Sequence, residues 1–242
     1  MSDSLLSVRS LTARYGAAQI LFGIDLDLRA GEVVALMGRN GAGKSTTLKA
    51  IMGLLDQRSG DITFRDADIS HLRPYEIARL GLGFVPEDRR VFSDLTVLEN
   101  LEVGRRPARK NADGRLVDPW TPERLFELFP NLAEARRRAA GRMSGGEQQM
   151  LTVARTLMGN PYAILLDEPS EGVAPVIVDA MADMILALRS SGVAILLSEQ
   201  NLPFASLVAA RAYILERGEI RYSGSIDELR GNEEIRRAYL EV

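Results

Sequence analysis

The sequence predicts an α/β fold in which a parallel sheet forms the core, with an N-terminal antiparallel β subdomain and an inserted α-helical subdomain. Apolar and polar residues alternate through the first thirty residues, which is typical of antiparallel strands with one buried face. Three continuous apolar runs follow, at Glu32–Met37, Ala163–Leu166 and Val193–Leu197, and such runs are typical of strands buried on both faces. Helical periodicity separates the runs, so the order of elements indicates a parallel sheet with right-handed crossovers.

Local patterns predict the remaining elements. Apolar residues at helical spacing predict a helix over Ser45–Leu55, with Gly53 near its end. Residues from about 70 to 160 have helical periodicity, interrupted by a Pro/Gly/Asp-rich break at Pro107–Pro119, so we expect the helical subdomain there. The shorter predicted elements are a strand at Asp61–Phe64, a helix at Val176–Leu188, a hairpin formed by Tyr213–Leu215 and Glu219–Tyr222, and a final helix at Asn232–Tyr239. Together they indicate a single domain over residues 1–242.

Composition excludes several classes of protein. No apolar run approaches the roughly 18 to 20 residues that a membrane-spanning helix needs, and the segment Met1–Leu6 lacks the features of a secretory signal. A chain without cysteine has no disulfides, thiolate metal sites or cysteine nucleophile. The net charge of −3 argues against a surface built to hold a polyanion, so we expect no nucleic-acid partner. A cytoplasmic protein is the simplest interpretation.

A glycine-rich segment follows the first buried strand directly and matches the pattern G-x-x-x-x-G-K-[ST]. Its residues are Gly38, Arg39, Asn40, Gly41, Ala42, Gly43, Lys44 and Ser45. Glycines are needed because successive backbone N–H groups wrap the phosphates of a nucleotide, and the helix that follows adds the positive end of its dipole. We expect Lys44 to neutralise the β- and γ-phosphates, Ser45 to ligate Mg²⁺, and Thr46 to add a phosphate hydrogen bond.

Two adjacent carboxylates, Asp167 and Glu168, end the second buried strand. Burying such a pair is expensive unless a cation or a catalytic need offsets it. We expect Asp167 to hold the Mg²⁺ shell and Glu168, on the other face of the strand, to polarise an attacking water.

A third segment, Met143–Gln149, opens a helix with the residues Ser144, Gly145, Gly146 and Glu147. Physically it is a helix N-terminus with serine and glycine donors, which suits an anion. The segment resembles the Leu-Ser-Gly-Gly-Gln signature of ABC ATPases, from which Met143 and Glu147 differ. In that family the segment binds the γ-phosphate of the nucleotide held by the opposite subunit, so two chains enclose two nucleotides.

The resemblance to ABC ATPases extends over essentially the whole chain and implies a P-loop NTPase core of the RecA-like type. It implies that Tyr15 stacks on adenine and that Glu87 occupies the place of the glutamine that reaches the metal and senses the transporter. Within the family the chain is most similar to one ATP-binding subunit of branched-chain amino acid importers. The stretches that carry this similarity are Gly38–Leu48, Val85–Phe92, Trp120–Pro130, Ser144–Met150, Asp167–Pro175 and Glu199–Asn201.

The resemblance implies an ATPase with ATP and Mg²⁺ as cofactors, which energises the uptake of branched-chain amino acids or a related small solute. It implies a peripheral position on the cytoplasmic face of the inner membrane. The implied partners are transmembrane permease subunits, a second ATPase subunit, expected to be a paralogue, and indirectly a substrate-binding protein. The segment Leu80–Arg106, with the arginines Arg105 and Arg106, is expected to dock on the transporter.

Three residues depart from the wider ABC pattern: Glu87 replaces glutamine, Ala174 stands in place of aspartate, and Gln200 stands in place of histidine. Gln200 is expected to contact the γ-phosphate and help to position the water, with less positive charge than a histidine would supply. The sole histidine, His71, lies far upstream. Two other classes stay open: a soluble ABC protein that acts on nucleic acid or ribosomes, and a regulatory nucleotide-binding module with little turnover. The first usually has fused copies or a coiled-coil insertion, and the sequence contains neither.

Overall fold

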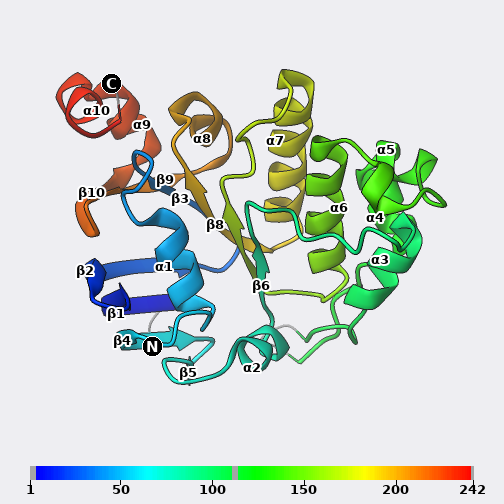
Figure 1. Cartoon of the computed structure of the whole chain (residues 1–242), viewed down its shortest axis with the longest axis horizontal. Helices are drawn as coiled ribbons and strands as arrows, with labels where there is room; N and C mark the ends of the chain where they lie inside the picture. The colour runs from blue at the N-terminus through cyan, green and yellow to red at the C-terminus, as the bar shows by residue number, and fades with distance from the viewer. Residues whose placement is uncertain (1–3, 111–113, 241–242) are drawn as a thin grey trace.

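The computed structural model describes residues 4–110 and 114–240. They form a core sheet, a smaller antiparallel sheet that packs with α1 against one face of it, and a group of helices against the other face and beyond one edge (Figure 1). The predicted α/β fold is therefore confirmed.

The core sheet has the strand order β10-β9-β3-β8-β7-β6. β3 pairs in parallel with β8 and β9, β7 pairs in parallel with β8 and β6, and β10 runs antiparallel to β9. The strands are β3 (Val33–Met37), β6 (Leu82–Val85), β7 (Ala163–Asp167), β8 (Ala194–Glu199), β9 (Arg211–Glu216) and β10 (Glu219–Ser225). The carboxyl ends of β3, β8 and β7 lie at one edge of the sheet, which is where ligands of open α/β folds bind.

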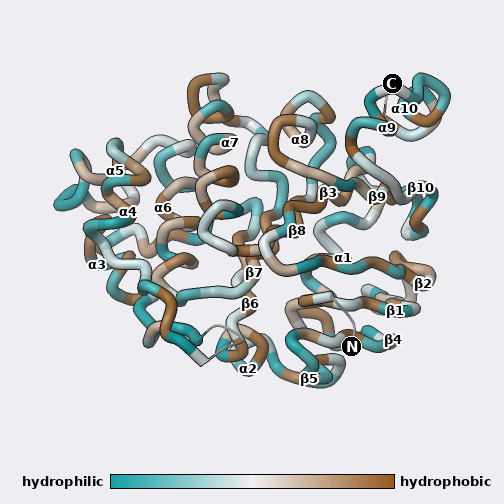
Figure 2. The backbone as a smooth tube through the Cα atoms, turned by 180° about the vertical axis from the view of Figure 1, so that it is seen from behind, coloured by the Kyte–Doolittle hydropathy of each residue, from teal (hydrophilic) through white to brown (hydrophobic). Residues whose placement is uncertain are grey.

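The central strands are buried on both faces, as their continuous apolar sequences predict. In β3, Val34 and Leu36 belong to the core shared with the antiparallel sheet, whereas Val33, Ala35 and Met37 belong to the core shared with the helices. β7 and β8 are likewise buried at every residue. Figure 2 shows hydrophobic residues concentrated along these inner strands and on the inner sides of the helices. This burial holds the strand ends in fixed positions.

The antiparallel sheet has the order β2-β1-β4-β5 and packs with α1 and α2. Its strands and the two helices are β1 (Ser4–Tyr15), β2 (Ala18–Arg29), β4 (Arg58–Phe64), β5 (Ala67–Asp68), α1 (Lys44–Ile51) and α2 (Pro74–Arg79). Helix α1 ends before the predicted Leu55, because Gly53 adopts a φ of 75° and its amide bonds the carbonyl of Ala50.

The other helices cover the second face of the core sheet and extend beyond its β6 edge. They are α3 (Val97–Gly104), α4 (Pro122–Leu128), α5 (Pro130–Glu134), the short 3₁₀ helix η1 (Ala140–Arg142), α6 (Gly145–Leu157), α7 (Pro175–Ser190), α8 (Leu202–Val208), α9 (Ile226–Gly231) and α10 (Glu233–Tyr239). The stretch of about 70–160, expected to be a helical subdomain, also contains β6, which pairs with β7 in the core sheet. Helices α3 to α6 all follow β6. Within the described residues, no helix combines the length and apolar character needed to cross a membrane.

Candidate nucleotide-binding site

The phosphate loop connects β3 to α1 at the carboxyl edge of the core sheet. Gly41 and Gly43 adopt φ values of 79° and 113°, a region that favours glycine. Gly43 is the N-cap of α1, no side chain caps the helix, and its first turn carries no acidic residue. The first N–H groups of an α-helix have no partner within the helix. The loop therefore presents amides and a helix dipole to an anion.

Lys44 is buried at the start of α1, with a relative exposure of 3%. Its ammonium donates to the carbonyls of Gly38 at 2.7 Å and Arg39 at 3.2 Å, and it pairs with Glu168 Oε1 at 3.0 Å. The structure thus brings together the phosphate-binding lysine and the carboxylate expected to act on water.

Asp167 lies at the end of β7, directly opposite the start of α1. Its Oδ1 atom accepts hydrogen bonds from Ser45 Oγ at 2.9 Å and Ser198 Oγ at 2.7 Å. Burial raises the pKa of the Asp167 carboxyl, and the hydrogen bonds from Ser198 and Ser45 oppose that shift. Ser198, on the neighbouring strand β8, was not predicted as a site residue, because only the parallel register of β7 and β8 places it there.

The Ser45 hydroxyl and the Asp167 carboxylate fit a Mg²⁺ site. Both are hard oxygen ligands, and Mg²⁺ in nucleotide sites usually combines one or two such protein ligands with phosphate oxygens and water. Among the described residues no group of three or more His, Cys, Asp or Glu side chains could hold a metal ion. The Ser45 and Asp167 oxygens suit a cation whose other ligands are phosphate oxygens and water.

Glu168 follows Asp167 in a left-handed conformation, with a φ of 43°. Its amide donates to the carbonyl and the hydroxyl of Ser198, both at 3.1 Å. Its Oε2 atom is buried and has no hydrogen-bond partner among the described residues. A hydrogen bond with Glu168, followed by burial, raises the pKa of Glu171 to about 7.

Glu199 was also missed as a site residue, although its position at the end of a buried strand parallels that of Asp167. Its carboxylate accepts from the amides of Ser170 at 3.2 Å and of Gln200 and Asn201, both at 3.1 Å. Burial raises the pKa of Glu199, and these hydrogen bonds oppose the shift. Glu199 therefore joins the segment after Glu168 to the segment that carries Gln200.

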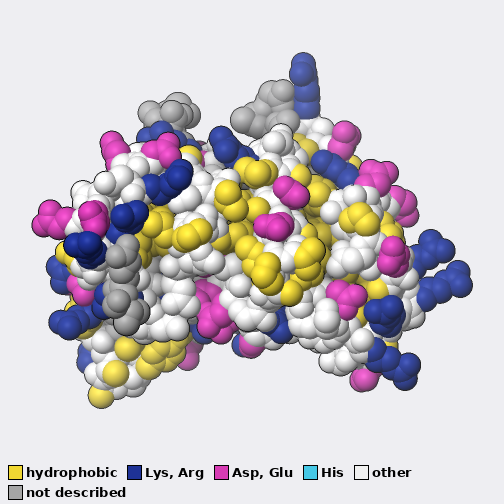
Figure 3. Space-filling model, turned by 90° about the horizontal axis from the view of Figure 1, so that it is seen from above, with side chains coloured by type: hydrophobic (Ala, Val, Ile, Leu, Met, Phe, Trp, Pro, Cys, Tyr) yellow, Lys and Arg dark blue, Asp and Glu magenta, His cyan; other side chains and the backbone are white. Residues whose placement is uncertain are grey.

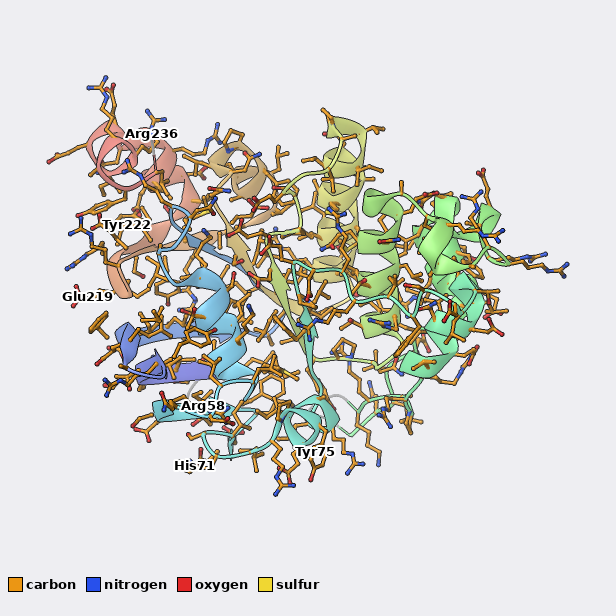
Figure 4. The ribbon with its side chains drawn as sticks, in the orientation of Figure 1. Arg58, His71, Tyr75, Glu219, Tyr222 and Arg236 are labelled. Atoms are coloured by element: carbon orange, nitrogen blue, oxygen red, sulfur yellow. The ribbon has the colours of Figure 1, made fainter. Side chains whose placement is uncertain are left out.

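Three other predicted site residues have the following positions. Gln200 follows β8 and is exposed, with its backbone held by Glu199. Glu87 follows β6, and its charge contributes to the raised pKa of Glu171. Tyr15 ends β1 with 49% of its surface exposed, as a stacking residue requires. The sole histidine, His71, lies below the antiparallel sheet at the lower edge of the view, whereas Arg236 of α10 lies at its upper edge (Figure 4).

The Ser144–Glu147 segment is not brought to the phosphate loop of its own chain. It begins α6, which is separated from α1 by the inner strands of the core sheet (Figure 1). Ser144 Oγ accepts from the amide of Glu147 at 3.3 Å, and Glu147 Oε2 accepts from the amide of Ser144 at 2.7 Å. This capping box lowers the pKa of Glu147, and Ser144 is exposed while Gly145, Gly146 and Glu147 are partly exposed.

Known proteins resemble this chain in both sequence and structure. The family model described as ABC transporter matches residues 21–171. The high-affinity branched-chain amino acid transport ATP-binding protein BraG of Pseudomonas aeruginosa is 42% identical over 98% of this chain and 99% of its own length. The probable branched-chain amino acid transport ATP-binding protein LivF of Archaeoglobus fulgidus is 34% identical over 96% of both chains.

A solved nucleotide-free ATP-binding cassette from an ABC transporter superposes with a TM-score of 0.79 at 27% identity. The superposition covers 96% of this chain and 97% of the cassette. The family model matches more than half of the chain, and the relatives match nearly all of it. With the phosphate loop, the carboxylate pair and the Ser-Gly-Gly segment in these positions, the chain belongs to the ABC transporter family as an ATP-binding protein.

Proposed function

We propose that this chain is the ATP-hydrolysing subunit of an ABC importer, which works from the cytoplasmic face of the inner membrane. One observation carries the proposal: Lys44, Ser45, Asp167 and Glu168 meet at the carboxyl ends of β3 and β7. An anion cradle, two oxygen ligands for Mg²⁺ and a buried carboxylate are the parts that phosphoryl transfer to water requires.

In this mechanism the residues of the chain position the reactants. The phosphate-loop amides and Lys44 hold the β- and γ-phosphates, while Glu168 orients a water in line with the γ-phosphate and accepts its proton as the oxygen attacks. The bond between the γ-phosphorus and the bridging oxygen breaks, and ADP leaves with the electron pair. Mg²⁺, held by Ser45 and Asp167, would neutralise charge on the phosphate oxygens. The Lys44–Glu168 pair must open before this geometry forms.

A second ATPase subunit completes the site in this proposal. Ser144 to Glu147 face away from the phosphate loop of their own chain, so they serve a nucleotide held by another subunit. The face seen from above carries a group of hydrophobic side chains near its centre (Figure 3). On α7 and α8, Val176 is 70% exposed and Leu207 is 60% exposed, which suits a protein contact. Because Gln200 supplies less positive charge than histidine, we expect the partner to be a paralogue that keeps the histidine.

The names of the relatives support branched-chain amino acids as the transported cargo. The relative with 42% identity over nearly the full length is a branched-chain amino acid transport ATP-binding protein. The cargo itself would be selected by permease subunits and a substrate-binding protein, with which this chain would work indirectly.

A groove of about 550 Å³ between α2, β6, α3 and α6 is the surface that we assign to the permease. Its walls include the exposed apolar side chains of Leu54, Tyr75, Phe92 and Val103. Figure 4 shows Tyr75 at the outer edge of the fold, on α2. Three arginines, Arg79, Arg106 and Arg155, also line the groove, and no acidic residue is among its lining residues. The matching occupant is a short permease helix with an apolar face and a carboxylate.

Uptake by whole cells tests the proposed function. In a strain that lacks this gene, uptake of labelled leucine at low concentration should fall, and the wild-type gene should restore it. The variant Lys44→Ala should not restore uptake, because it removes the main charge that faces the phosphates. A tag on this chain should also capture membrane permeases and a second ATPase. Normal leucine uptake without the gene would contradict the proposed cargo, and capture of no membrane protein would contradict the transporter role.

A further inference from the structure

Arg89 lies against the first glycine of the Ser-Gly-Gly segment. A Cβ atom built on Gly145 would collide with Arg89 Nη1 and would lie 3.0 Å from its Cζ and 3.5 Å from its Nη2. The guanidinium therefore lies against the backbone at the start of α6, and a side chain at position 145 would require Arg89 to move. Arg89 comes from a distant part of the chain, two residues after Glu87.

The loop that carries Arg89 is held in an uncommon conformation by α6 itself. Arg89 and Arg90 have φ values of 59° and 21°, which non-glycine residues rarely adopt. The Thr152 hydroxyl donates to the carbonyl of Arg89, and Arg155 Nη2 donates to the carbonyl of Arg90 at 2.7 Å. Two side chains of α6 thus fix the backbone that carries the guanidinium.

The charge of Arg89 is uncompensated where it lies. Within residues 4–110 and 114–240 its guanidinium makes no ion pair or hydrogen bond, whereas the neighbouring Arg90 pairs with Asp88 at 2.7 Å. The acidic residue of the segment, Glu147, is bonded to the Ser144 amide and lies 3.6 Å from Arg138. A cation at a helix N-terminus is unfavourable, because the dipole there is already positive. An anion bound in front of the helix would attract both the guanidinium and the positive end of the helix dipole, and would thereby offset their mutual repulsion.

We propose that Arg89 binds the γ-phosphate of the ATP held by the opposite subunit, next to the donors of Ser144 to Gly146. The inference rests on the proposed function, because it requires the two-subunit arrangement. A planar guanidinium binds phosphate oxygens bidentately. Arginines supplied in trans to other phosphate-loop enzymes stabilise the charge of the transition state. Arg89 is thus a phosphate-binding residue that lies outside the signature sequence. It lies on the loop between Glu87 and Phe92, and Phe92 lines the permease groove.

Nucleotide kinetics on the transporter complex test the proposal. The complex is purified through a tag on this chain, so that any partner ATPase and permease come with it. Arg89→Ala should lower kcat/KM for ATP by at least about tenfold, and Arg89→Lys should recover part of the loss because it keeps the charge. The inhibition constant for ADP should change by less than about twofold, because ADP lacks the γ-phosphate that Arg89 contacts. Arg90→Ala, which changes the adjacent arginine, should behave as the wild type.

Three results would overturn the role of Arg89: unchanged kcat/KM in Arg89→Ala, an equal loss of ADP affinity, or an equal effect of Arg90→Ala. The melting temperature of each complex shows whether a loss comes from unfolding. If Arg89→Ala unfolds, Arg89→Lys is the deciding variant. A loss of ADP affinity in Arg89→Lys as large as its loss of kcat/KM for ATP rejects the proposal. A wild-type complex that hydrolyses no ATP would instead reject the proposed function.

Discussion

Lys44 is fully engaged by protein acceptors before a nucleotide binds. Its ammonium has three N–H donors, and the carbonyls of Gly38 and Arg39 and the carboxylate of Glu168 accept from them. Both members of the Lys44–Glu168 pair are buried, so the pair is weakly screened by solvent. A nucleotide phosphate that binds Lys44 would therefore have to replace Glu168 as its partner, so Glu168, the proposed base, would also compete for the cation.

This competition predicts that Glu168→Gln binds ADP more tightly than the wild type. The neutral amide attracts Lys44 less strongly, so the ammonium is easier to transfer to a phosphate. We expect an increase of about fivefold, equivalent to about 1 kcal/mol. Calorimetric titration with ADP measures this increase in affinity. ADP is used because it is the product of hydrolysis, so no turnover contributes to the measured heat. An ADP affinity equal to or lower than that of the wild type would show that the pair does not oppose binding.

Glu171 makes the stability of the nucleotide-free protein depend on pH near neutrality. Its pKa is raised to about 7 by its hydrogen bond with Glu168, followed by burial and the charges of Glu168 and Glu87. A raised carboxyl pKa favours the protonated form in the folded state. This contribution to stability is complete below the pKa of the unfolded chain, near 4.5, and is lost as the pH rises through about 7.

Substitution Glu171→Gln should therefore flatten the pH dependence of the melting temperature between pH 6 and 8, within about one unit either side of that pKa. The amide stays neutral over this pH range. Thermal unfolding of both proteins without nucleotide measures the difference. Parallel curves for the two proteins would mean that Glu171 does not take up a proton in this range.

At the scale of single elements, the permease groove depends on how α3 and α6 pack. A Cβ atom on Gly104 would collide with the carbonyl of Arg155, so the end of α3 lies directly on α6. The two arginines after α3 then differ in their surroundings. Arg105 forms a two-point ion pair with Glu102 at 2.6 Å, whereas Arg106 lines the groove. The sequence presents them as one basic patch, and only the helix packing distinguishes them.

Charge reversal at these two positions should separate docking from catalysis. Arg106→Glu places an acid in a groove expected to receive an acidic permease helix, so transport should fall at least about fivefold while the basal ATPase activity of the purified complex changes by less than about twofold. Arg105→Glu is the matched control and should have a smaller effect on transport. Uptake and ATPase assays on both variants measure this. Equal effects of the two substitutions would contradict the assignment of the groove.

At the scale of the whole molecule, the sequence predicted the elements that carry the site better than the contacts between them. The runs at β3, β7 and β8, and the motifs that end them, were identified because buried strands and glycine-rich turns have local signatures. β6 was not identified, since Leu82–Val85 is short and interrupted by Gly83. Three contacts of the site join residues far apart in the sequence. They are the Lys44–Glu168 ion pair, the hydrogen bond from Ser198 to Asp167, and the hydrogen bond that Glu199 accepts from the amide of Ser170. Their positions follow from strand order and register, which local patterns do not specify.

The whole molecule also sets how the two nucleotide-binding surfaces are used. The phosphate loop and the Ser144–Glu147 segment lie on either side of the inner strands, so one chain supplies half of each of two sites in the proposed assembly. Val176 on α7 and Leu207 on α8 are exposed apolar side chains, which suit a contact between two subunits in the proposed assembly.

The ATPase rate of the purified complex with Glu168→Gln tests the central claim most directly. The glutamine keeps the shape of the side chain and removes the charge that orients and polarises the water. The account predicts that ATP still binds while phosphate release falls by at least about a hundredfold relative to the wild-type complex. Phosphate release at close to the wild-type rate would contradict the assignment of Glu168, and with it the account of how this chain hydrolyses ATP.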